Sequence, residues 1–325
     1  QAENGAVPIT VPETAPYRRL MAANAREFGD EPPVGVAGWS DAAVLVPYTM
    51  YRLTGNRRIL EEQYESMTHW CGYIIRTAEG RRGDSGLPHE VDSVLWNTGF
   101  HFGEWLIPSE EKGITQKEAC QRSAFYTAPI FGYLSVKCMA EIAEVLQKPE
   151  KVYYSRTAVQ MKAAIQTALI CDGELRSQNM GAYVLMIAFD LVPEHCKEHF
   201  AQKLISLLDS HHGCLDTGFL ATPFLLDAFV KIGRRDLAIK LLWQTRMPSW
   251  LYEVEQGATS VWESWDAITP GSEPRITSYN HYAFGCVDAW IFENIAGIRA
   301  LEPGFRRVEI APDPDGLPLE YCNFH

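Results

Sequence analysis

The chain has 325 residues, with 29 basic and 41 acidic side chains and a formal net charge of −12. This acidic balance argues against a nucleic-acid partner and against an anionic membrane surface, because both present negative charge to a protein. Hydrophobic residues make up 46% of the chain and charged residues 22%, which is typical of a folded globular protein. No apolar run reaches the roughly 18 residues that would indicate a membrane span.

The cysteines give no sign of a metal or redox site. Eight are scattered along the chain, and no two form a Cys-x-x-Cys pair, so neither a metal ion nor another cofactor is expected. Most are predicted to be buried thiols, which favours a reducing compartment and a cytoplasmic location. His211 and His212 have no carboxylate or cysteine at ligand spacing, and we interpret them as solvated.

Helical patterning dominates the chain after an irregular start. Residues 1–38 are predicted to be a leading loop, because prolines and glycines interrupt any regular element. The segment 79–116 is expected to be a long functional loop, since it contains four large aromatic side chains. One short strand is predicted at 306–311. Apolar residues recurring at three- to four-residue steps predict nine helices, at about 41–54, 57–78, 118–147, 150–170, 177–190, 194–209, 218–232, 234–246 and 279–297.

The alternation of short turns and long aromatic loops indicates helices in antiparallel pairs. We therefore expect an all-α protein, an (α/α)6 toroid with long loops gathered at one mouth. Nine helices fall short of six pairs, so the toroid is expected to be incomplete at its N-terminus. The predicted domains are a helical toroid over residues 1–300 and a linker over 301–325 with the first strand of a truncated β domain.

The stretch 248–266 has the richest chemistry, because Glu263 and Asp266 alternate there with Trp262 and Trp265. An indole face can stack on the C–H face of a pyranose, while a carboxylate can address hydroxyls or an attacking water. This combination is typical of sugar-binding sites. The alternative is a surface loop whose tryptophans pack inward and whose acids are solvated.

A second polar pair, Asn280 and His281, stands near the start of a strongly apolar predicted helix. A helix start would place these groups at the mouth of a toroid. Asn280 could instead be a helix cap, and His281 a core histidine. Because His281 follows Glu263 by only 18 residues across one loop, we expect both to reach the same pocket.

Two further acid–indole pairs lie at junctions between loops and helices. Trp39 and Asp41 stand directly before a predicted buried helix, and Glu104 and Trp105 follow the long aromatic segment. Asp41 taken alone is a common N-cap residue. Three such pairs together favour one shared sugar pocket.

Several of these stretches, in the same order, resemble the bacterial α-L-rhamnosidases of glycoside hydrolase family 78. The most specific match combines Gly-Ala-Thr-Ser-Val-Trp-Glu-Ser-Trp-Asp at 257–266 with Asn-His-Tyr-Ala at 280–283. The resemblance covers roughly residues 35–311. It implies an (α/α)6 toroid flanked by β-sandwich domains and the hydrolysis of terminal α-L-rhamnosides with inversion.

The resemblance also implies roles for individual residues. Glu263 matches the general base. Glu104 stands where many members have aspartate, and Trp262 is a weaker candidate than Trp39 and Trp105 for lining the sugar. The substrate-binding residues that the resemblance implies are Trp39, Asp41, Glu104, Trp105 and His281, and the position of Trp262 beside Glu263 adds it to the predicted set.

One segment of the family has no match in this sequence. The family's general acid lies in an Asp-x-x-x-Arg-Asp-Glu-Arg-x-Gly-Trp segment, and the only superficially similar pair, Asp30 and Glu31, is not assigned as the acid. Because inversion needs both an acid and a base, we expect the chain to be a fragment that is inactive or nearly so alone. Its expected partners are the rest of a parent polypeptide and a rhamnose-containing oligosaccharide or glycoside.

Other function classes stay open beside this one. The chain could be a non-catalytic carbohydrate-binding toroid that lost its acid during evolution. An isoprenoid cyclase would need an Asp-rich DDxxD or DxDD segment, which the sequence lacks. A polysaccharide lyase acting on uronates would favour a basic cleft, and the net charge of −12 argues against it.

Overall fold

The computed structural model describes residues 1–12, 14–17, 19, 34–80, 86–110, 114–314 and 316–317. Asp30, Glu31, Cys322 and part of the leading loop lie outside these residues. The chain forms two compact units. The first comprises Gln1–Gly103, Thr115–Arg176 and Glu302–Arg306, and the second comprises Glu104–Ile114, Ser177–Leu301 and Arg307–His325. Across the described ranges, every helix is too short or too polar to cross a bilayer.

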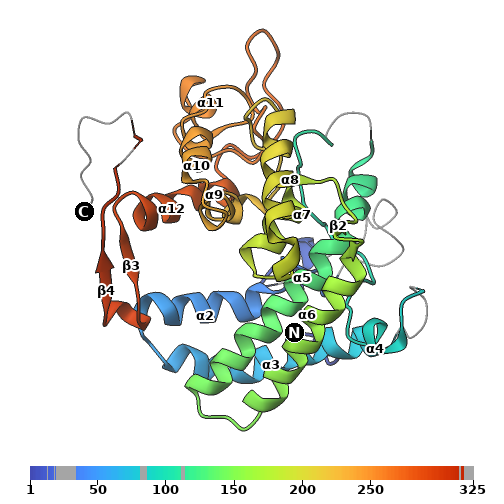
Figure 1. The fold of residues 1–325 in the computed structure, drawn as a ribbon. Helices are drawn as coiled ribbons and strands as arrows, with labels where there is room; N and C mark the ends of the chain where they lie inside the picture. The colour runs from blue at the N-terminus through green and yellow to red at the C-terminus, as the bar shows by residue number, and fades with distance from the viewer. Residues whose placement is uncertain are drawn as a thin grey trace. The chain divides into compact units, whose positions relative to one another are not determined.

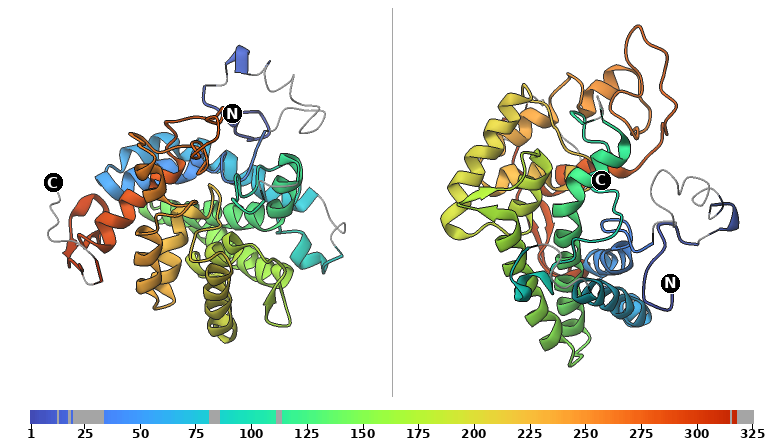
Figure 2. Two further views of the ribbon diagram at one scale, coloured as in Figure 1. Left: turned by 90° about the horizontal axis from the view of Figure 1, so that it is seen from above. Right: turned by 90° about the vertical axis from the view of Figure 1, so that its right-hand side faces the viewer.

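The first unit is built from packed helices (Figure 1). Helix α2 packs on α3 and α5, and α5 runs alongside α6, as Figures 1 and 2 both show. Trp70, Trp96 and Tyr126 are fully buried and form much of its core. The helices are α2 (Ala42–Thr54), α3 (Arg58–Gly80), α4 (His89–Asp92), α5 (Gln116–Val145) and α6 (Lys151–Leu169).

Local sequence signals explain where α5 begins and how the unit ends. The Thr115 hydroxyl accepts a hydrogen bond from the Glu118 backbone N–H, and the Glu118 carboxylate accepts one from Thr115, which makes a capping box. After α6, β1 (Ile170–Cys171) and β2 (Glu174–Leu175) form a hairpin. Its turn residues, Asp172 and Gly173, both have positive φ, as a tight two-residue hairpin turn requires.

The second unit is centred on two buried helices. Helix α7 is buried from Met180 through Ile187 and packs on α8 and α9. Helix α9 also contacts α10, η2 and α12. The elements are α7 (Met180–Ala188), η1 (Glu194–Cys196), α8 (Lys197–Ser210), α9 (Thr222–Lys231), α10 (Arg235–Leu242), α11 (Trp250–Glu255), η2 (Ala283–Cys286) and α12 (Val287–Asn294).

Every helix predicted from the sequence has a counterpart among the described residues, so the helix-rich prediction is confirmed. The last one is shorter than predicted. Residues 279–282 are not helical because the segment 278–281 pairs with 261–263 instead. Two short helices, α4 and α11, were not predicted, since neither is long enough to show a helical period.

The predicted strand at 306–311 is confirmed as β4 (Val308–Ile310). It pairs antiparallel with β3 (Ile298–Ala300), with Ile298 opposite Ile310 and Ala300 opposite Val308. The two strands lie beside the end of α12 (Figure 1). That β4 opens a further β domain, and that the chain divides at residues 300 and 301, stay predictions.

Candidate active site

The structure places Glu263 and His281 on two backbone segments that pair with each other. The Glu263 N–H donates to the Ser278 carbonyl over 3.0 Å, and the His281 N–H donates to the Val261 carbonyl over 2.8 Å. These bonds make a short antiparallel pairing of 261–263 with 278–281. Residues 264–280, between Glu263 and His281, therefore form a loop that brings the chain back beside the segment from which it left.

The Glu263 carboxylate is half-buried and held by one of its two oxygens. Oε2 accepts hydrogen bonds from the Thr277 hydroxyl, over 3.1 Å, and from the Ser278 backbone N–H, over 3.0 Å. Among the described residues, no protein group donates to Oε1. The side chain is thus oriented by the opposite segment while one oxygen stays available to a water or a substrate hydroxyl.

The His281 ring contacts two aromatic side chains. Its ring centroid lies 5.0 Å from that of Phe219 and 5.4 Å from that of Tyr282, and the Tyr282 ring is nearly parallel to it. The Nδ1 atom accepts a hydrogen bond from the Ala283 N–H. Because Nδ1 is an acceptor, a neutral ring has its proton on Nε2, where it can donate to a ligand oxygen.

A residue that the sequence analysis missed, Glu253, supports the same loop from α11. Its Oε2 accepts a hydrogen bond from the Trp262 backbone N–H, and its backbone carbonyl accepts one from Ala258. The side chain is only 3% exposed, and burial raises the pKa of Glu253 to about 7. Ser249, which caps α11 by accepting from Tyr252, is the sequence signal that would have revealed this helix.

Trp262 itself lies in the interior of the second unit. It is 2% exposed, and its ring packs edge-on against Tyr279, with 5.9 Å between centroids. The weaker prediction that Trp262 contacts the sugar stays a prediction.

Glu104 is a buried carboxyl surrounded by backbone N–H groups. Oε1 accepts from the Ala221 N–H over 2.9 Å, and the N–H groups of Gly218 and Leu220 also stabilise the carboxylate. Burial outweighs these bonds and raises the pKa of Glu104 to about 8. The carboxyl therefore remains largely protonated at neutral pH.

Glu104 and the half-buried Trp105 are held against the loop before α9. The Trp105 carbonyl accepts from the Phe219 N–H. The Gly218 backbone approaches so closely that an added Cβ would lie 2.2 Å from the Trp105 carbonyl oxygen. Only glycine fits there, which explains the Thr-Gly-Phe sequence at this point.

Asp41, in the first unit, is fully buried. Oδ1 accepts from the Trp70 indole N–H, over 2.9 Å, and from the Ser135 hydroxyl, while Oδ2 accepts from the Gly38 N–H over 2.7 Å. Burial raises the pKa of Asp41 to about 6 despite these three bonds. Asp41 does stand at the N-cap position of α2, as the alternative had it, but its side chain makes no capping hydrogen bond.

The neighbouring Trp39 is half-buried and packs on Phe102, with 4.9 Å between ring centroids. The loop before it is held by His101, which sequence reasoning missed. His101 Nδ1 accepts from the Ala37 N–H, and Nε2 lies 3.0 Å from the Thr98 carbonyl. Burial lowers the pKa of His101 to about 4, so the ring is neutral and Nε2–H is the donor.

The predicted site residues thus fall into local groups. Trp39 and Asp41 lie in the first unit. Glu104, Trp105, Trp262, Glu263 and His281 lie in the second. That the groups share one sugar pocket stays a prediction. Within the part of the chain that the structure describes, no three His, Cys, Asp or Glu side chains are grouped so that they could hold a metal ion.

Comparisons with known proteins agree on one family. The model of the bacterial α-L-rhamnosidase six-hairpin glycosidase domain matches residues 1–295. An α-L-rhamnosidase of Streptomyces avermitilis is 34% identical over 286 residues, which are 87% of this chain and 25% of that protein. One from Formosa agariphila is 32% identical over 321 residues, 97% of this chain and 31% of that protein. The chain therefore spans about a quarter to a third of the length of these relatives.

Solved structures give the same result. The α-L-rhamnosidase of Streptomyces avermitilis complexed with L-rhamnose matches with a TM-score of 0.81 and 30% identity, over 97% of this chain and 27% of that one. The native enzyme from Aspergillus terreus matches with a TM-score of 0.75 and 30% identity, over 86% and 32%. The helix-rich fold is thus the six-hairpin glycosidase fold, as the resemblance implied, and the chain belongs to the bacterial α-L-rhamnosidase six-hairpin glycosidase family.

Proposed function

We propose that this chain is the catalytic toroid of a glycoside hydrolase that removes terminal α-L-rhamnose from rhamnosides with inversion. The observation that supports this most is the hydrogen bonding of the Glu263 carboxylate. Its Oε2 is held by Thr277 and Ser278, and its Oε1 has no protein donor among the described residues. A half-buried carboxylate fixed in this way is suited to accept a proton from water.

In the proposed mechanism, Glu263 acts as the general base. A water bound to Oε1 attacks the anomeric carbon on the face opposite the leaving group, and its proton passes to Glu263. A carboxylic acid on the other side of the sugar protonates the glycosidic oxygen as the bond to the aglycone breaks. The two proton transfers balance, and rhamnose leaves with inverted configuration.

The other site residues are proposed to bind and orient the sugar. His281 Nε2 would donate to a rhamnose hydroxyl, because Nδ1 is already occupied by the Ala283 N–H. The indoles of Trp105 and Trp39 would pack against the rhamnose ring. Glu104 and Asp41 would act mainly by positioning the loops that carry these tryptophans, since both carboxyls are buried.

We further propose that the general acid lies outside these 325 residues, because the sequence has no counterpart of the family's acid segment. The test is the isolated chain with methyl α-L-rhamnopyranoside, whose leaving group needs a proton. No release of rhamnose above the buffer rate is expected. Clear hydrolysis by the isolated chain would place the acid within it and contradict this proposal.

The reaction itself is tested in a polypeptide that contains this chain together with the acid segment. Proton NMR during the first minutes of hydrolysis of an α-L-rhamnoside should show β-L-rhamnose first, because inversion at the anomeric carbon turns α into β. First-formed α-L-rhamnose would contradict inversion. Binding of rhamnose without any release would favour the non-catalytic alternative.

A further inference from the structure

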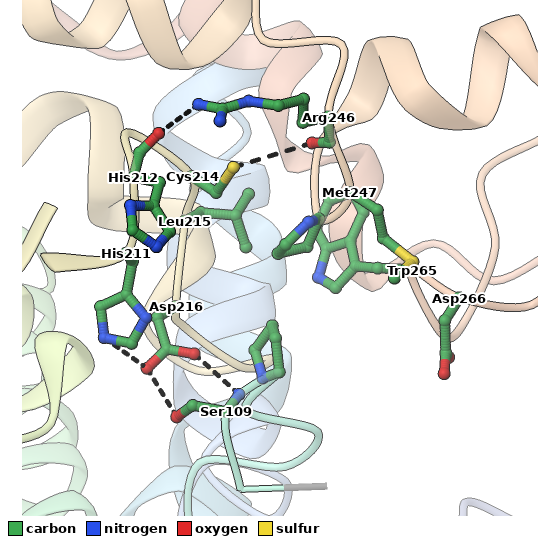
Figure 3. A pocket seen from close by; sticks show the side chains of 12 residues that line it. Ser109, His211, His212, Cys214, Leu215, Asp216, Arg246, Met247, Trp265 and Asp266 are labelled. Atoms are coloured by element: carbon green, nitrogen blue, oxygen red, sulfur yellow. Dashed lines mark hydrogen bonds and ion pairs between the residues drawn. The ribbon is translucent and has the colours of Figure 1, made fainter. Parts of the chain in front are cut away.

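The second unit contains a cavity of about 320 Å³ that includes none of the residues predicted to bind rhamnose. Segments 108–109, 211–216, 246–248 and 265–266 surround it (Figure 3). We call it the Asp216 pocket. The side chains that matter for its chemistry are Ser109, His211, Asp216, Arg246, Trp265 and Asp266.

One wall of the pocket is an ordered polar network around Asp216. Its Oδ1 accepts from the Ser109 N–H over 2.9 Å, and its Oδ2 accepts from the Ser109 hydroxyl over 2.8 Å. His211 Nε2 lies 3.3 Å from the same Oδ2. The interpretation of His211 as solvated is therefore wrong, because a carboxylate five residues along the chain folds back to it. This network fixes the His211 ring at the edge of the pocket.

Trp265 lies across the pocket from the Asp216 carboxylate (Figure 3). The indole is 4% exposed and wedged between Trp250 and Phe284, with centroid distances of 5.6 and 4.2 Å. Its Nε1–H is buried and has no hydrogen-bond partner among the described residues. Native proteins rarely leave a buried donor unpaired, so a ligand hydroxyl is a natural partner for it.

The charges around the pocket favour a neutral ligand. Asp216 faces His211, and Asp266 is paired with Arg275. The Arg246 guanidinium donates to the His212 carbonyl and to the Gln244 side chain. The carboxylates of Asp216 and Asp266 are matched in number by the guanidinium groups of Arg246 and Arg275, so the fixed charges at the pocket sum to zero and favour neither a phosphate nor a cation.

The remaining surface of the pocket is apolar, and Met247, Pro248 and Pro108 contribute to it. A few placed polar groups among apolar ones, in a volume near the lower end of ligand sites, suit a small ring with both C–H and hydroxyl faces. Trp265 follows Glu263 by two residues, so their Cα atoms are at most about 7 Å apart. A molecule in the pocket would therefore lie close to the proposed general base.

We propose that the Asp216 pocket binds a neutral pyranose, as a carbohydrate subsite next to the one that holds rhamnose. The choice of a sugar as the ligand rests on the proposed function. In a substrate that spans both sites, the second sugar would be the one that carries the rhamnose, and the pocket would select for it.

The Trp265 indole N–H is a direct reporter of occupancy. The chain is labelled with ¹⁵N-tryptophan, the Trp265 signal is identified by its loss in Trp265→Phe, and methyl β-D-glucopyranoside is titrated in. A saturable shift of the Trp265 signal is expected. His211→Gln and Asp216→Asn should each weaken binding about fivefold or more, the effect of losing one hydrogen bond. Asp236→Asn, an exposed aspartate paired with Arg234, is the matched control and should bind as the wild type does.

Asp216→Asn could disturb the Ser109 loop, so His211→Gln, at a partly exposed side chain, keeps the test decisive. A Trp265 signal that does not respond to the glucoside, or a response that both variants leave unchanged, would overturn the proposal. Glu263→Gln separates it from the proposed function, because that variant should retain the Trp265 response. If Glu263→Gln abolishes rhamnose release by the polypeptide that also contains the acid segment, while Trp265 of the isolated chain never responds, the pocket proposal fails and the proposed function stands.

Discussion

Asp41 and Glu263 each follow a tryptophan at a loop, yet the two carboxylates differ in how deeply they are buried and in how many of their oxygens accept hydrogen bonds. Asp41, in the first unit, has no exposed surface and accepts from the loop at Gly38, from α3 at Trp70 and from α5 at Ser135. Glu263, in the second unit, is half-buried and accepts at only one oxygen.

The difference shows that an indole next to an acid does not by itself define a reactive group. The two residues differ in how many of their carboxylate oxygens already accept hydrogen bonds from protein groups. Both oxygens of Asp41 accept hydrogen bonds from the protein, and these bonds join three segments of its unit. Glu263 is oriented by the structure but keeps an oxygen for chemistry.

The largest effect is expected for Glu263→Gln in a polypeptide that hydrolyses rhamnosides. Turnover should fall by several orders of magnitude, because the contribution of a general base is about 10² to 10⁴ and the attacking water loses its proton acceptor. The Gln carbonyl can still accept from Thr277 and Ser278, so the melting temperature and rhamnose binding should hardly change. Glu255→Gln, at an exposed position nearby, is the control. Turnover within tenfold of the wild type would remove Glu263 from the mechanism.

Asp41→Ala should instead lower stability. It leaves a buried indole N–H, a hydroxyl and a backbone N–H without their acceptor, which is expected to cost about 3–5 kcal/mol in the free energy of unfolding. Urea denaturation of the isolated chain measures this, with Asp209→Ala on the exposed side of α8 as the control. A loss below about 1 kcal/mol would show that Asp41 does not join the three segments.

Glu104→Gln should change how stability depends on pH. The folded pKa of about 8 lies above the ordinary value of 4.5, so the folded state binds the proton more tightly than the unfolded chain does. Stability from this group is therefore lost as pH rises from about 4.5 to about 8. Glutamine stays neutral, so between pH 5 and pH 7 the variant should gain about 2–3 kcal/mol relative to the wild type. The same difference in unfolding free energy between the variant and the wild type at pH 5 and at pH 7 would contradict a raised pKa of Glu104.

Substitutions of Glu253 should have the smallest effect, because Glu253 acts through the backbone of Trp262. Glu253→Ala removes the acceptor for the Trp262 N–H and should lower kcat several-fold with little change in KM, whereas Glu253→Gln keeps an acceptor and should restore most of it. Steady-state kinetics of both variants measure the changes in kcat and in KM separately. Equal losses in the two variants would show that the hydrogen bond to Trp262 is not what matters.

Much of the architecture was predictable because it depends on local pattern. The long helices α3, α5 and α6 have a clear apolar period, and their predicted ranges lie close to the observed ones. The short elements α4, α11 and the β1–β2 hairpin were missed, since their few residues cannot display a period. The last helix starts late because 278–281 pairs with 261–263, a tertiary choice that helical propensity does not report.

The sequence allowed the residues of the candidate site to be chosen, but not their burial or their hydrogen-bond partners. The short loop between Glu263 and His281 suggested that they lie together, and their backbone segments are indeed hydrogen-bonded; that both side chains reach one pocket stays a prediction. The burial of Asp41 and Glu104 depends on partners far along the chain, such as Ser135 and Ala221, and no spacing rule links these. Glu253 and His101 were missed for the same reason, because their importance comes from the backbone groups that they hold.

The most direct test of the central claim is chemical rescue of Glu263→Ala. If Glu263 serves only to activate the attacking water, a nucleophile that needs no base should replace that water in the space left by the side chain. In the polypeptide that also contains the acid segment, sodium azide should then restore much of the lost turnover of an α-L-rhamnoside and yield the β-L-rhamnosyl azide. No recovery with azide in a folded variant that still binds rhamnose, or formation of the α-azide, would contradict the role assigned to Glu263.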